Sequence, residues 1–557
     1  MTKMANEIKS NDNNSNQRQQ QRMAIILLII TMFGCFLYMK FTDFLVIALQ
    51  SQLQINGDPN DFTKNWQDPP IPITIDAYIF SIDNPQEFAS GHSRAKIREM
   101  GPYSYRLAIH KEIVSFEDDN RIVTFFDVQK FYFKNHESHG QLSDRVNVLN
   151  FPAYAMANMV RGMIASMPFS FGLNPIVFSL VSLLFLTHGE SMIKQNLTAG
   201  QLLNGYPFRI LDTIDRLAAP LRLFGIELPD TGMPDNKFGF LWTKNGTKNG
   251  PYQTYTGQDG TDLLRMVTFK GQYQLDFYDN DECNALNGTE GSTLGLNVHR
   301  DRYYYLFTHD LCRSLNVIYQ QDTWVNGFHT YRFGPDRNAF AAPRKNPLNR
   351  CFCRHMDNEN LCDGIFDLSK CLAGAPLAYS FPHFLYAHSD IRTNVENMRP
   401  SENRHRAYID VDPITGSPFN GVDKIQINAL LEPIPYLSGY SDVRSTILPL
   451  LWMQKSAKID DKLSGELRLA LYPIYAVYII IYLLFFGGFS LLTIHIARWS
   501  YQSYKIRTNR TMMTNVVNTT DEKKPPSRSS STEPLYQQQQ QSSSIQIDNQ
   551  QQSIKMN

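Results

Sequence analysis

The chain has 557 residues, 43% of them hydrophobic, and its 53 lysine and arginine residues balance 53 aspartate and glutamate residues. A chain without excess positive charge offers little attraction to a polyanion, which argues against nucleic acid as a partner. The mean hydropathy of -0.32 indicates that most of the chain faces water, so its apolar residues must be concentrated in a few segments.

Residues 1–22 are polar and rich in Asn and Gln, which predicts a disordered cytosolic tail. The uncharged run from Met23 to Met39 follows, and a transmembrane helix is predicted over residues 23–45. A cleaved signal peptide is the alternative interpretation. Because bulky residues occupy 36–41 where small residues would mark a cleavage site, an uncleaved signal-anchor is favoured.

The large segment 46–468 is predicted to be an extracellular or lumenal ectodomain. From Ile71 to Val128 short runs alternate between apolar and polar residues, as in Ile73–Phe80, and turn residues separate them. This period of two predicts strands and hairpins. Residues 143–225 are predicted to be helical, with the main helices at about 150–215, and residues 238–450 return to short strands.

The uncharged run Gly162–Gly189 is long enough to be a third span. An alternative is a pair of short helices broken at Asn174-Pro175, either buried as a hairpin or partly exposed as a surface that meets lipid or a partner. The candidate ligand contacts in the exposed interpretation are Met167, Phe169, Phe171, Ile176, Phe178 and Phe185.

Six of the seven cysteines lie between residues 283 and 371, which favours disulfides in an oxidising compartment. Zinc is the rival interpretation, but no CxxC pair is present. Three N-x-[ST] sequons, at Asn196, Asn245 and Asn287, predict glycosylation and therefore lumenal exposure of the same segment.

A second span is predicted over residues 469–497, between Arg468 and Arg498, and residues 498–557 form a Ser- and Gln-rich tail predicted to be disordered and cytosolic. Basic residues precede the first span, at Arg18 and Arg22, and follow the second span, at Arg498, Lys505, Arg507 and Arg510. The positive-inside rule then places both termini in the cytosol, which requires an even number of spans and excludes a third span at 162–189.

Catalytic motifs are weak. The sequence contains no GxSxG elbow, P-loop or Rossmann fingerprint. His136 and His139 are only a near miss to HExxH, and His405 with Asp410 and Asp412 could form a triad or metal site but is equally typical of a polar turn. We therefore predict neither catalysis, cofactor nor metal.

Several motifs occur together in a specific order between the two spans. They are Asn84-Pro85-Gln86-Glu87, Gly101-Pro102-Tyr103-Ser104-Tyr105-Arg106, Asp310-Leu311-Cys312-Arg313-Ser314, Asn346-Pro347, Cys351-Phe352-Cys353, Asp367-Leu368-Ser369-Lys370-Cys371, Pro382-His383-Phe384-Leu385-Tyr386-Ala387 and Asp412-Pro413-Ile414-Thr415-Gly416. In this order the chain resembles the class B scavenger receptors. That family includes the fatty-acid translocase or thrombospondin receptor, the scavenger receptor for high-density lipoprotein, a lysosomal integral membrane protein and the insect sensory neuron membrane proteins.

The resemblance implies an α+β ectodomain with an antiparallel β-barrel core, a helical apex bundle and an internal lipid tunnel. It also implies three disulfides, Cys283–Cys351, Cys312–Cys371 and Cys353–Cys362. Some members carry apical lysines that bind anionic ligands, whereas the corresponding stretch Leu186–Gly189 has none.

The function that the resemblance implies is a plasma-membrane receptor that captures lipid or lipoprotein ligands at its apex and passes lipid through the tunnel to the membrane. Fatty acids, sterols and carotenoids are the expected lipids. The alternative is a recognition receptor for particles, apoptotic cells or a protein cargo, in which lipid transfer is secondary and an endosomal or lysosomal membrane is the location.

Overall fold

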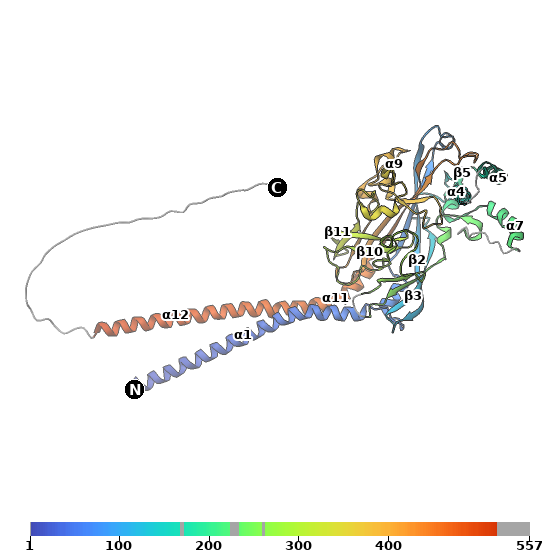
Figure 1. Ribbon diagram of the computed structural model, residues 1–557. Helices are drawn as coiled ribbons and strands as arrows, with labels where there is room; N and C mark the ends of the chain where they lie inside the picture. Colours follow the sequence, from blue (N-terminus) through green and yellow to red (C-terminus); the bar gives the residue numbers. More distant parts are fainter. Residues whose placement is uncertain (1, 167–171, 223–232, 259–261, 521–557) are drawn as a thin grey trace, which may run out of the picture. The chain divides into compact units, whose positions relative to one another are not determined.

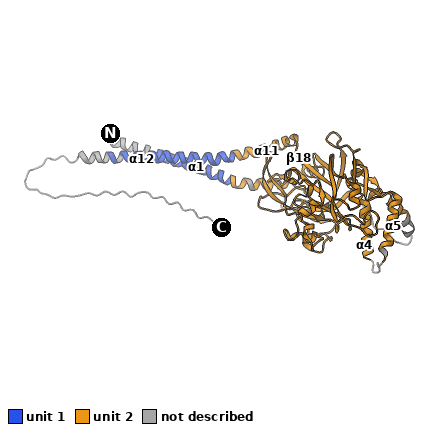
Figure 2. Ribbon diagram, turned by 90° about the horizontal axis from the view of Figure 1, so that it is seen from above, with its two compact units in different colours: residues 1–36, 480–557 blue, residues 37–479 orange. Residues whose placement is uncertain are grey.

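The computed structural model describes residues 2–166, 172–222, 233–258 and 262–520. Two compact units divide the chain (Figure 2): residues 1–36 with 480–557 form one, and residues 37–479 form the other. The second unit contains the sheet and is called the ectodomain below.

Long helices occupy both ends of the chain. Helix α1 runs over Thr2–Gln52, and α11 (Asp461–Tyr482) continues through a π-helical turn at Leu483–Gly487 into α12 (Gly488–Thr520). Candidate membrane spans lie at Ser15–Leu45 and Tyr472–Asn509, where most side chains are exposed. Among the described residues these are the two such helices, and the apolar run 162–189 does not add a third.

The predicted disorder of the tails is wrong for the residues that the structure describes there. Residues 2–22 belong to α1, and residues 498–520 belong to α12. The polar composition of both segments does not prevent a helix from continuing out of an apolar one, because the costly nucleating turn is already formed.

Helix α1 closely approaches the π-helical turn and the start of α12 at glycines, within the unit that the chain ends form. A Cβ atom added to Gly34 would come within 2.7 Å of the Phe485 backbone nitrogen, and one added to Gly488 would come within 2.8 Å of the Thr31 hydroxyl oxygen. Small residues at such crossings let two backbones pack in the absence of a hydrophobic driving force between helices.

One large sheet forms the centre of the ectodomain (Figure 1). Its strand order along the main path is β10 (Tyr304–Thr308), β11 (Arg313–Val325), β12 (Phe328–Pro335), β16 (Tyr408–Val411), β17 (Pro418–Leu431), β18 (Thr446–Lys458), β1 (Ile73–Ile82), β2 (Ala95–Glu117), β3 (Ile122–Phe133), β8 (Lys248–Tyr255) and β9 (Met266–Phe269). Neighbouring strands on this path are antiparallel.

The two ends of this sheet come together through one residue. Thr289 forms one bridge with Arg265, beside β9, and another with Leu306 in β10. The sheet is therefore nearly closed as a barrel, and the short strands predicted on both sides of the apolar run belong to it. Closure leaves few unpaired edges.

Helices gather at one end of the ectodomain, the apex. They are α4 (Phe151–Ala165), α5 (Leu173–His188), α6 (Ala199–Asn204) and α7 (Ile210–Arg222). Figures 1 and 2 show α4 and α5 at the opposite end of the ectodomain from the start of α11. The prediction of helix throughout 143–225 missed two strands, β4 (Arg145–Leu149) and β5 (Ile193–Thr198), which pair with each other.

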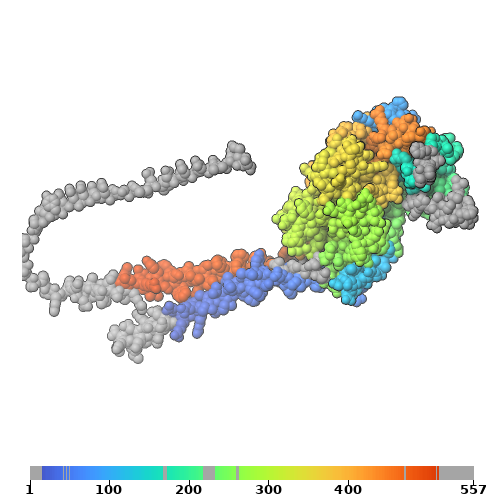
Figure 3. Space-filling view, in the orientation of Figure 1, coloured from blue at the N-terminus to red at the C-terminus, as the bar shows by residue number. Residues whose placement is uncertain are grey.

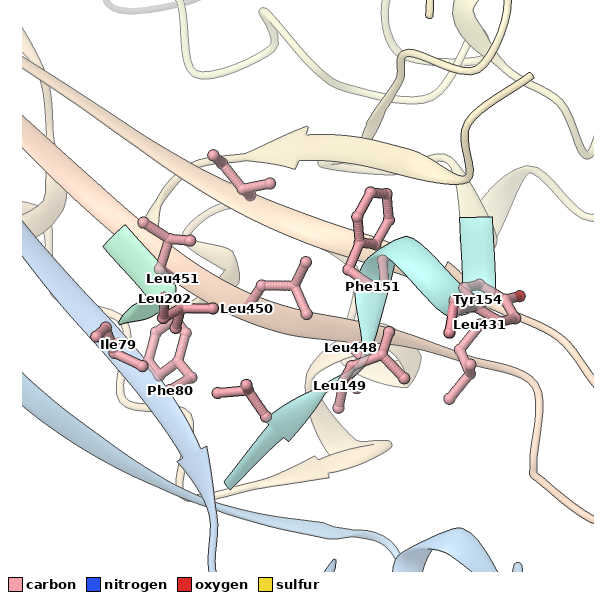
Figure 4. Packing of buried hydrophobic residues seen from close by; sticks show 14 of the residues in the cluster. Ile79, Phe80, Leu149, Phe151, Tyr154, Leu202, Leu431, Leu448, Leu450 and Leu451 are labelled. Carbon is pink, nitrogen blue, oxygen red and sulfur yellow. The ribbon is translucent and has the colours of Figure 1, made fainter. Parts of the chain in front are cut away.

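The largest hydrophobic core joins the apex to the barrel. Figure 4 shows Phe151 and Tyr154 of α4 packed beside Leu431 of β17 and Leu448 of β18. The Tyr154 hydroxyl also donates to the Leu430 carbonyl oxygen at 2.8 Å. Buried apolar contact and this hydrogen bond anchor the first apical helix to the sheet.

Short elements complete the ectodomain. They are α2 (Asp61–Gln67), α3 (Pro85–Ala89), β6 (Tyr206–Pro207), β7 (Lys237–Phe238), α8 (Asp281–Asn284), β13 (Phe366–Asp367), β14 (Leu377–Ser380), α9 (Ser389–Thr393), β15 (Val395–Glu396), α10 (Glu402–His405) and 3-10 turns at Pro234–Asn236, Trp242–Lys244, Pro347–Phe352, Glu359–Leu361 and Pro382–Phe384.

Candidate functional site

The inner face of the barrel wall is apolar over much of its length. Alternate residues of a strand point to the same side of a sheet, and the pairings Ile73↔Leu107 and Leu107↔Phe131 align one such row across three strands. Ile73, Ile75 and Leu107 form a buried cluster, against which Met453 and other side chains pack. This row continues from β18 through β1 and β2 to β3.

Two charged residues interrupt the apolar row. Lys455 of β18 stands in register with Ile75 on one side and with Asp423 of β17 on the other. Both charged side chains have exposed surface. Burial nevertheless raises the pKa of the Asp423 carboxyl, against the opposing charge of Lys455.

A second charged group lies at the far end of the strand order, just after β10. Asp310 forms an ion pair with Lys244 at 2.7 Å, and 37% of its side-chain surface is exposed. Burial opposes ionisation of this carboxyl, but the charges of Lys244, His309 and Lys455 outweigh it and hold the pKa of Asp310 well below its usual range. His309 Nδ1 and the Tyr252 hydroxyl share a hydrogen bond of 2.8 Å, and burial lowers the pKa of His309.

Lys455 interacts electrostatically with Asp310 and His309, although these residues are far apart in the strand order of the sheet. Lys455 lies on β18, in the middle of the strand order, whereas Asp310 follows β10 at its end. The Lys455 charge still acts on Asp310 and His309. Lys455, Asp423 and Asp310 keep exposed surface although the sheet that carries them is nearly closed, and we infer from this that they border an interior space. We call this space, lined by Lys455, Asp423, Asp310, Lys244 and His309, the lumen.

A cavity of about 280 Å³ lies at the end of the barrel where β1 begins and β18 leads toward α11. It is formed between the segment Asp68–Ile73 and residues 106–109 of β2. Pro69, Pro70 and Pro72 carry no backbone N–H and cannot extend the ladder with β2. The wall is therefore unpaired here, and Leu107 and Ile73 belong both to this cavity and to the apolar inner row.

The outer face of the same strands is covered by residues 381–405. Glu99 of β2 accepts hydrogen bonds at Oε2 from Trp452 Nε1 at 2.9 Å and from His383 Nε2 at 2.5 Å, and at Oε1 from Arg404 at 2.5 Å. Burial opposes ionisation of Glu99, but the hydrogen bonds from His383 and Trp452 together with the charges of His383 and Arg404 lower its pKa to about 2. His405 stacks on His383 with ring centroids 4.6 Å apart.

The structure does not assemble the triad of His405 with Asp410 and Asp412. Asp410 pairs with Arg332 through two contacts of 2.6 and 2.8 Å, and Asp412 accepts from the backbone of Thr415 in a turn. His405 belongs instead to the outer network around Glu99. Within the described ranges, no group of three or more His, Cys, Asp or Glu residues is arranged to hold a metal ion.

Helix α5 carries apolar side chains on both of its faces. Phe178, Val181 and Phe185 are buried and face the core, with Phe178 only 2% exposed. The opposite face is exposed, up to 78% at Leu186, and we call it the apical patch: Ile176, Leu180, Leu183 and Leu186. Figure 3 shows part of these apical helices, in teal, at the molecular surface.

Of the six candidate ligand contacts, Ile176 is exposed. The exposed interpretation is wrong for Phe178 and Phe185, which fill the core beneath α5 as the buried interpretation predicts. Met167, Phe169 and Phe171 lie outside the described residues. The predicted break into two helices is present, but it precedes Asn174-Pro175: α4 ends at Ala165, and Pro175 lies in the first turn of α5, where proline is tolerated.

The apical helices are fixed to the loop that follows β17. Arg161 of α4 forms an ion pair with Glu432 at 3.0 Å, and the Ser182 hydroxyl of α5 accepts from the Ser438 backbone N–H at 3.1 Å. The ring of Phe185 packs against Tyr440. These contacts attach the helix that carries the apical patch to the loop after β17.

The six clustered cysteines form three disulfides, Cys283–Cys351, Cys312–Cys371 and Cys353–Cys362. These are the pairs that the family resemblance implies, and they leave no thiolates for the zinc alternative. The sequon residues Asn196, Asn245 and Asn287 are all exposed.

Two apolar terminal helices that suit a two-pass membrane protein, and a nearly closed antiparallel barrel with an apical helix cluster between them, define the class of protein. Residues 23–499 match the model of the CD36 family, and the chain belongs to that family.

Similar proteins carry receptor and lysosomal names. Lysosome membrane protein 2 of Rattus norvegicus is 27% identical over 411 residues, which cover 72% of this chain and 78% of that protein. Scavenger receptor class B member 1 of Cricetulus griseus is 27% identical over 451 residues, covering 80% and 83%, and that of Sus scrofa is 27% identical over 417 residues, covering 74% and 76%.

Proposed function

We propose that this protein is a receptor that captures lipid or lipoprotein at its apex and passes the lipid through the lumen toward the membrane. The observation that carries the proposal is the inner face of the barrel. It combines an apolar row with exposed groups that are enclosed by protein, which is what a path for an amphiphile requires.

The lumen removes the main barrier to lipid transfer. A lipid that leaves a carrier would expose its chain to water, at a cost of about 0.8 kcal/mol for each CH₂ group. The row of Ile73, Ile75 and Leu107 offers continuous apolar contact along the barrel wall. No bond is made or broken in such a transfer, so the function needs no catalytic group.

The two ends of this path differ in chemistry. At the apex, the apical patch of four exposed aliphatic side chains on α5 is a surface for an apolar ligand. At the other end, the unpaired wall at Pro69–Pro72 provides a way out beside the segments that lead into α1 and α11. Capture at the apical patch should depend weakly on salt, since little Coulomb attraction is available to screen.

A second candidate function rests on the apical patch alone. An exposed aliphatic face is also suited to a protein cargo or a particle surface. One family of relatives is named for the lysosome membrane, and for this alternative we propose an endosomal or lysosomal location. For the lipid receptor we propose the plasma membrane.

The topology proposed for both functions places the two termini in the cytosol and Asn196, Asn245 and Asn287 on the other side, where they are glycosylated. Epitope tags at either end should be reached by antibody only after cells are permeabilised. Staining of either tag on intact cells would contradict this orientation.

Labelled lipid uptake separates the two functions. Cells that express the full chain should take up labelled fatty acid, sterol or carotenoid faster than vector controls, and mass spectrometry should find lipid bound to the purified protein. Surface expression without faster uptake and without bound lipid would contradict the lipid receptor and favour recognition of a cargo.

A further inference from the structure

Lys455 occupies an unusual position for a lysine. It lies near the end of β18, which is a central strand of the barrel, and its side chain is on the inner face with those of Met453 and Ala457. The side chain is exposed, and it lies on the face that we assign to the lumen. Within the described part of the chain, its ammonium group forms no ion pair within 4.0 Å of a carboxylate, although Asp423 is its cross-strand partner.

The acidic groups near Lys455 are poorly suited to be its permanent counter-ion. Asp310 is already neutralised by Lys244, at 2.7 Å. Burial raises the pKa of Asp423 and so disfavours its negative charge. Lys455 thus lacks a permanent ion-pair partner among the described carboxylates near it.

A charge in such a space has a strong preference for one kind of ligand. An ammonium group removed from bulk water is destabilised unless an anion or hydrogen-bond acceptors compensate it. A wholly apolar lipid would displace water from Lys455 and offer nothing in return. An amphiphile with one carboxylate would supply a charge-assisted hydrogen bond, and its chain could follow the apolar row of Ile75, Ile73 and Leu107.

We propose that Lys455 is the anchor for the carboxylate of a long-chain fatty acid in the lumen, so that the path favours fatty-acid anions over neutral lipids. This inference rests on the proposed transfer through the lumen. It assigns to Lys455 the selection of the ligand, and to the row that ends at the cavity beside Pro69–Pro72 the contact with its chain.

The test makes two comparisons. It compares a charged with an uncharged ligand, and it compares removal of a lysine charge from the inner face of β18 with removal of one from its outer face. Lys455→Met keeps the apolar stem of the side chain and removes its charge. Lys458→Met is the matched control, because Lys458 is also exposed but pairs with Asn420 at the end of β18 and lies on the opposite face from Lys455. The full-length protein, purified in lipid nanodiscs, is titrated with oleate and with methyl oleate, which has the same chain without the charge.

Lys455→Met should weaken oleate binding by roughly tenfold to a hundredfold, the range expected for loss of one hydrogen bond to a charged group. Methyl oleate binding should change little, and Lys458→Met should change neither. Equal oleate affinities for the wild type and Lys455→Met would overturn the anchor. An equal loss of both ligands would overturn it as well, since it would indicate a packing defect.

A third ligand, an oleoyl lysophosphatidate, distinguishes a carboxylate site from a general anion site. The anchor predicts that oleate binds more tightly; tighter binding of the phosphate, lost on Lys455→Met, would overturn the assignment to fatty acids. If the wild type binds none of the three lipids, the proposed function fails together with the anchor. If the wild type binds oleate and methyl oleate with equal affinity, or if Lys455→Met keeps the wild-type preference for oleate, only the anchor fails.

Discussion

The two faces of strands β17 and β18 differ in how their polar side chains are satisfied. On the outer face, Lys424 donates to the Arg404 carbonyl oxygen at 2.7 Å, the Gln426 side chain accepts from the His383 backbone N–H, and Trp452 donates to Glu99. On the inner face, Asp423 and Lys455 are in register and exposed without an ion pair between them.

The difference shows which face serves stability and which serves a ligand. Polar groups that are buried must be satisfied by partners for the fold to be stable. The outer network meets that requirement within the protein. The charged groups of the inner face have no ion pair with each other and can be solvated by water or bound by a ligand. Substitutions on this face should therefore change ligand binding more than stability.

Substitutions at two neighbouring residues of β18 test most sharply whether the outer face contributes more to stability than the inner face. Trp452→Ala should lower the free energy of unfolding by about 3–5 kcal/mol, because Trp452 is 1% exposed, stacks on Tyr78 and donates to Glu99. Met453→Ala, on the inner face, should cost about 1 kcal/mol or less, since its side chain is only partly buried. Thermal or denaturant unfolding of the purified protein measures both, and equal losses would contradict the assignment of the faces.

The apex offers the same contrast on one helix. Phe178→Ser should destabilise the protein by about 3 kcal/mol or more and reduce surface expression, because the side chain fills the core under α5. Leu180→Ser, on the apical patch, should change stability by less than about 0.5 kcal/mol but reduce ligand capture. Normal capture by a well-expressed Leu180→Ser would show that the apical patch does not receive the ligand.

The sequence predicts much of this fold but could not assign the faces of α5. Period-two alternation correctly indicates the strands around Ile73–Phe80, because one face of each strand is more buried. In α5 both faces are apolar, so periodicity cannot say whether Phe178 or Leu180 is exposed. The answer depends on Tyr440, which is distant in sequence and packs on Phe185.

The lumen could not be predicted from residues alone. Lys455 and Asp423 become partners only through the register of β17 with β18, and Asp310 meets them only because the sheet curls. Alternation along β18 could have placed Lys455 on the same face as Met453, but not across from Asp310. His405 shows the converse, because its nearness to Asp410 in sequence suggested a site that the fold separates.

Loss of a disulfide should have an effect comparable with loss of a core side chain. Cys312→Ser with Cys371→Ser removes a bond between residues 59 positions apart, and should cost about 2–5 kcal/mol and retain the protein in the secretory pathway. Glycosidase sensitivity and surface staining measure that retention. Normal surface levels would contradict a stabilising role for this bond.

Acid should weaken the outer network through His405. Its Nδ1 accepts from the Ser401 backbone N–H at 3.1 Å, and burial, with the charges of His383 and Arg404, lowers its pKa from 6.5 to about 3. As the pH falls from 6.5 toward 3, His405 takes up a proton in the unfolded chain but stays neutral in the folded protein, so the free energy of unfolding decreases. About 2 kcal/mol should disappear between pH 6.5 and about pH 5.

The matched variants for this prediction are His405→Gln, which should remove that part of the pH dependence, and His136→Gln in an exposed loop, which should keep it. The readout is the unfolding midpoint measured at each pH. A wild-type midpoint that does not fall over this range, or one whose fall survives in His405→Gln, would contradict the assignment. Glu99, with a pKa of about 2, adds a further loss only below about pH 4.5.

The central claim is that lipid moves through the lumen, and a covalent plug tests it most directly. In a Cys35→Ala background, which removes the free cysteine of α1, Lys455→Cys is alkylated with a bulky maleimide, and Lys458→Cys serves as the control on the outer face. Transfer of labelled lipid from emulsion particles to the bilayer is then measured in proteoliposomes. The account predicts that the adduct at 455 stops transfer while particle capture continues, and that the adduct at 458 changes neither. Undiminished transfer through a protein fully alkylated at 455 would contradict it.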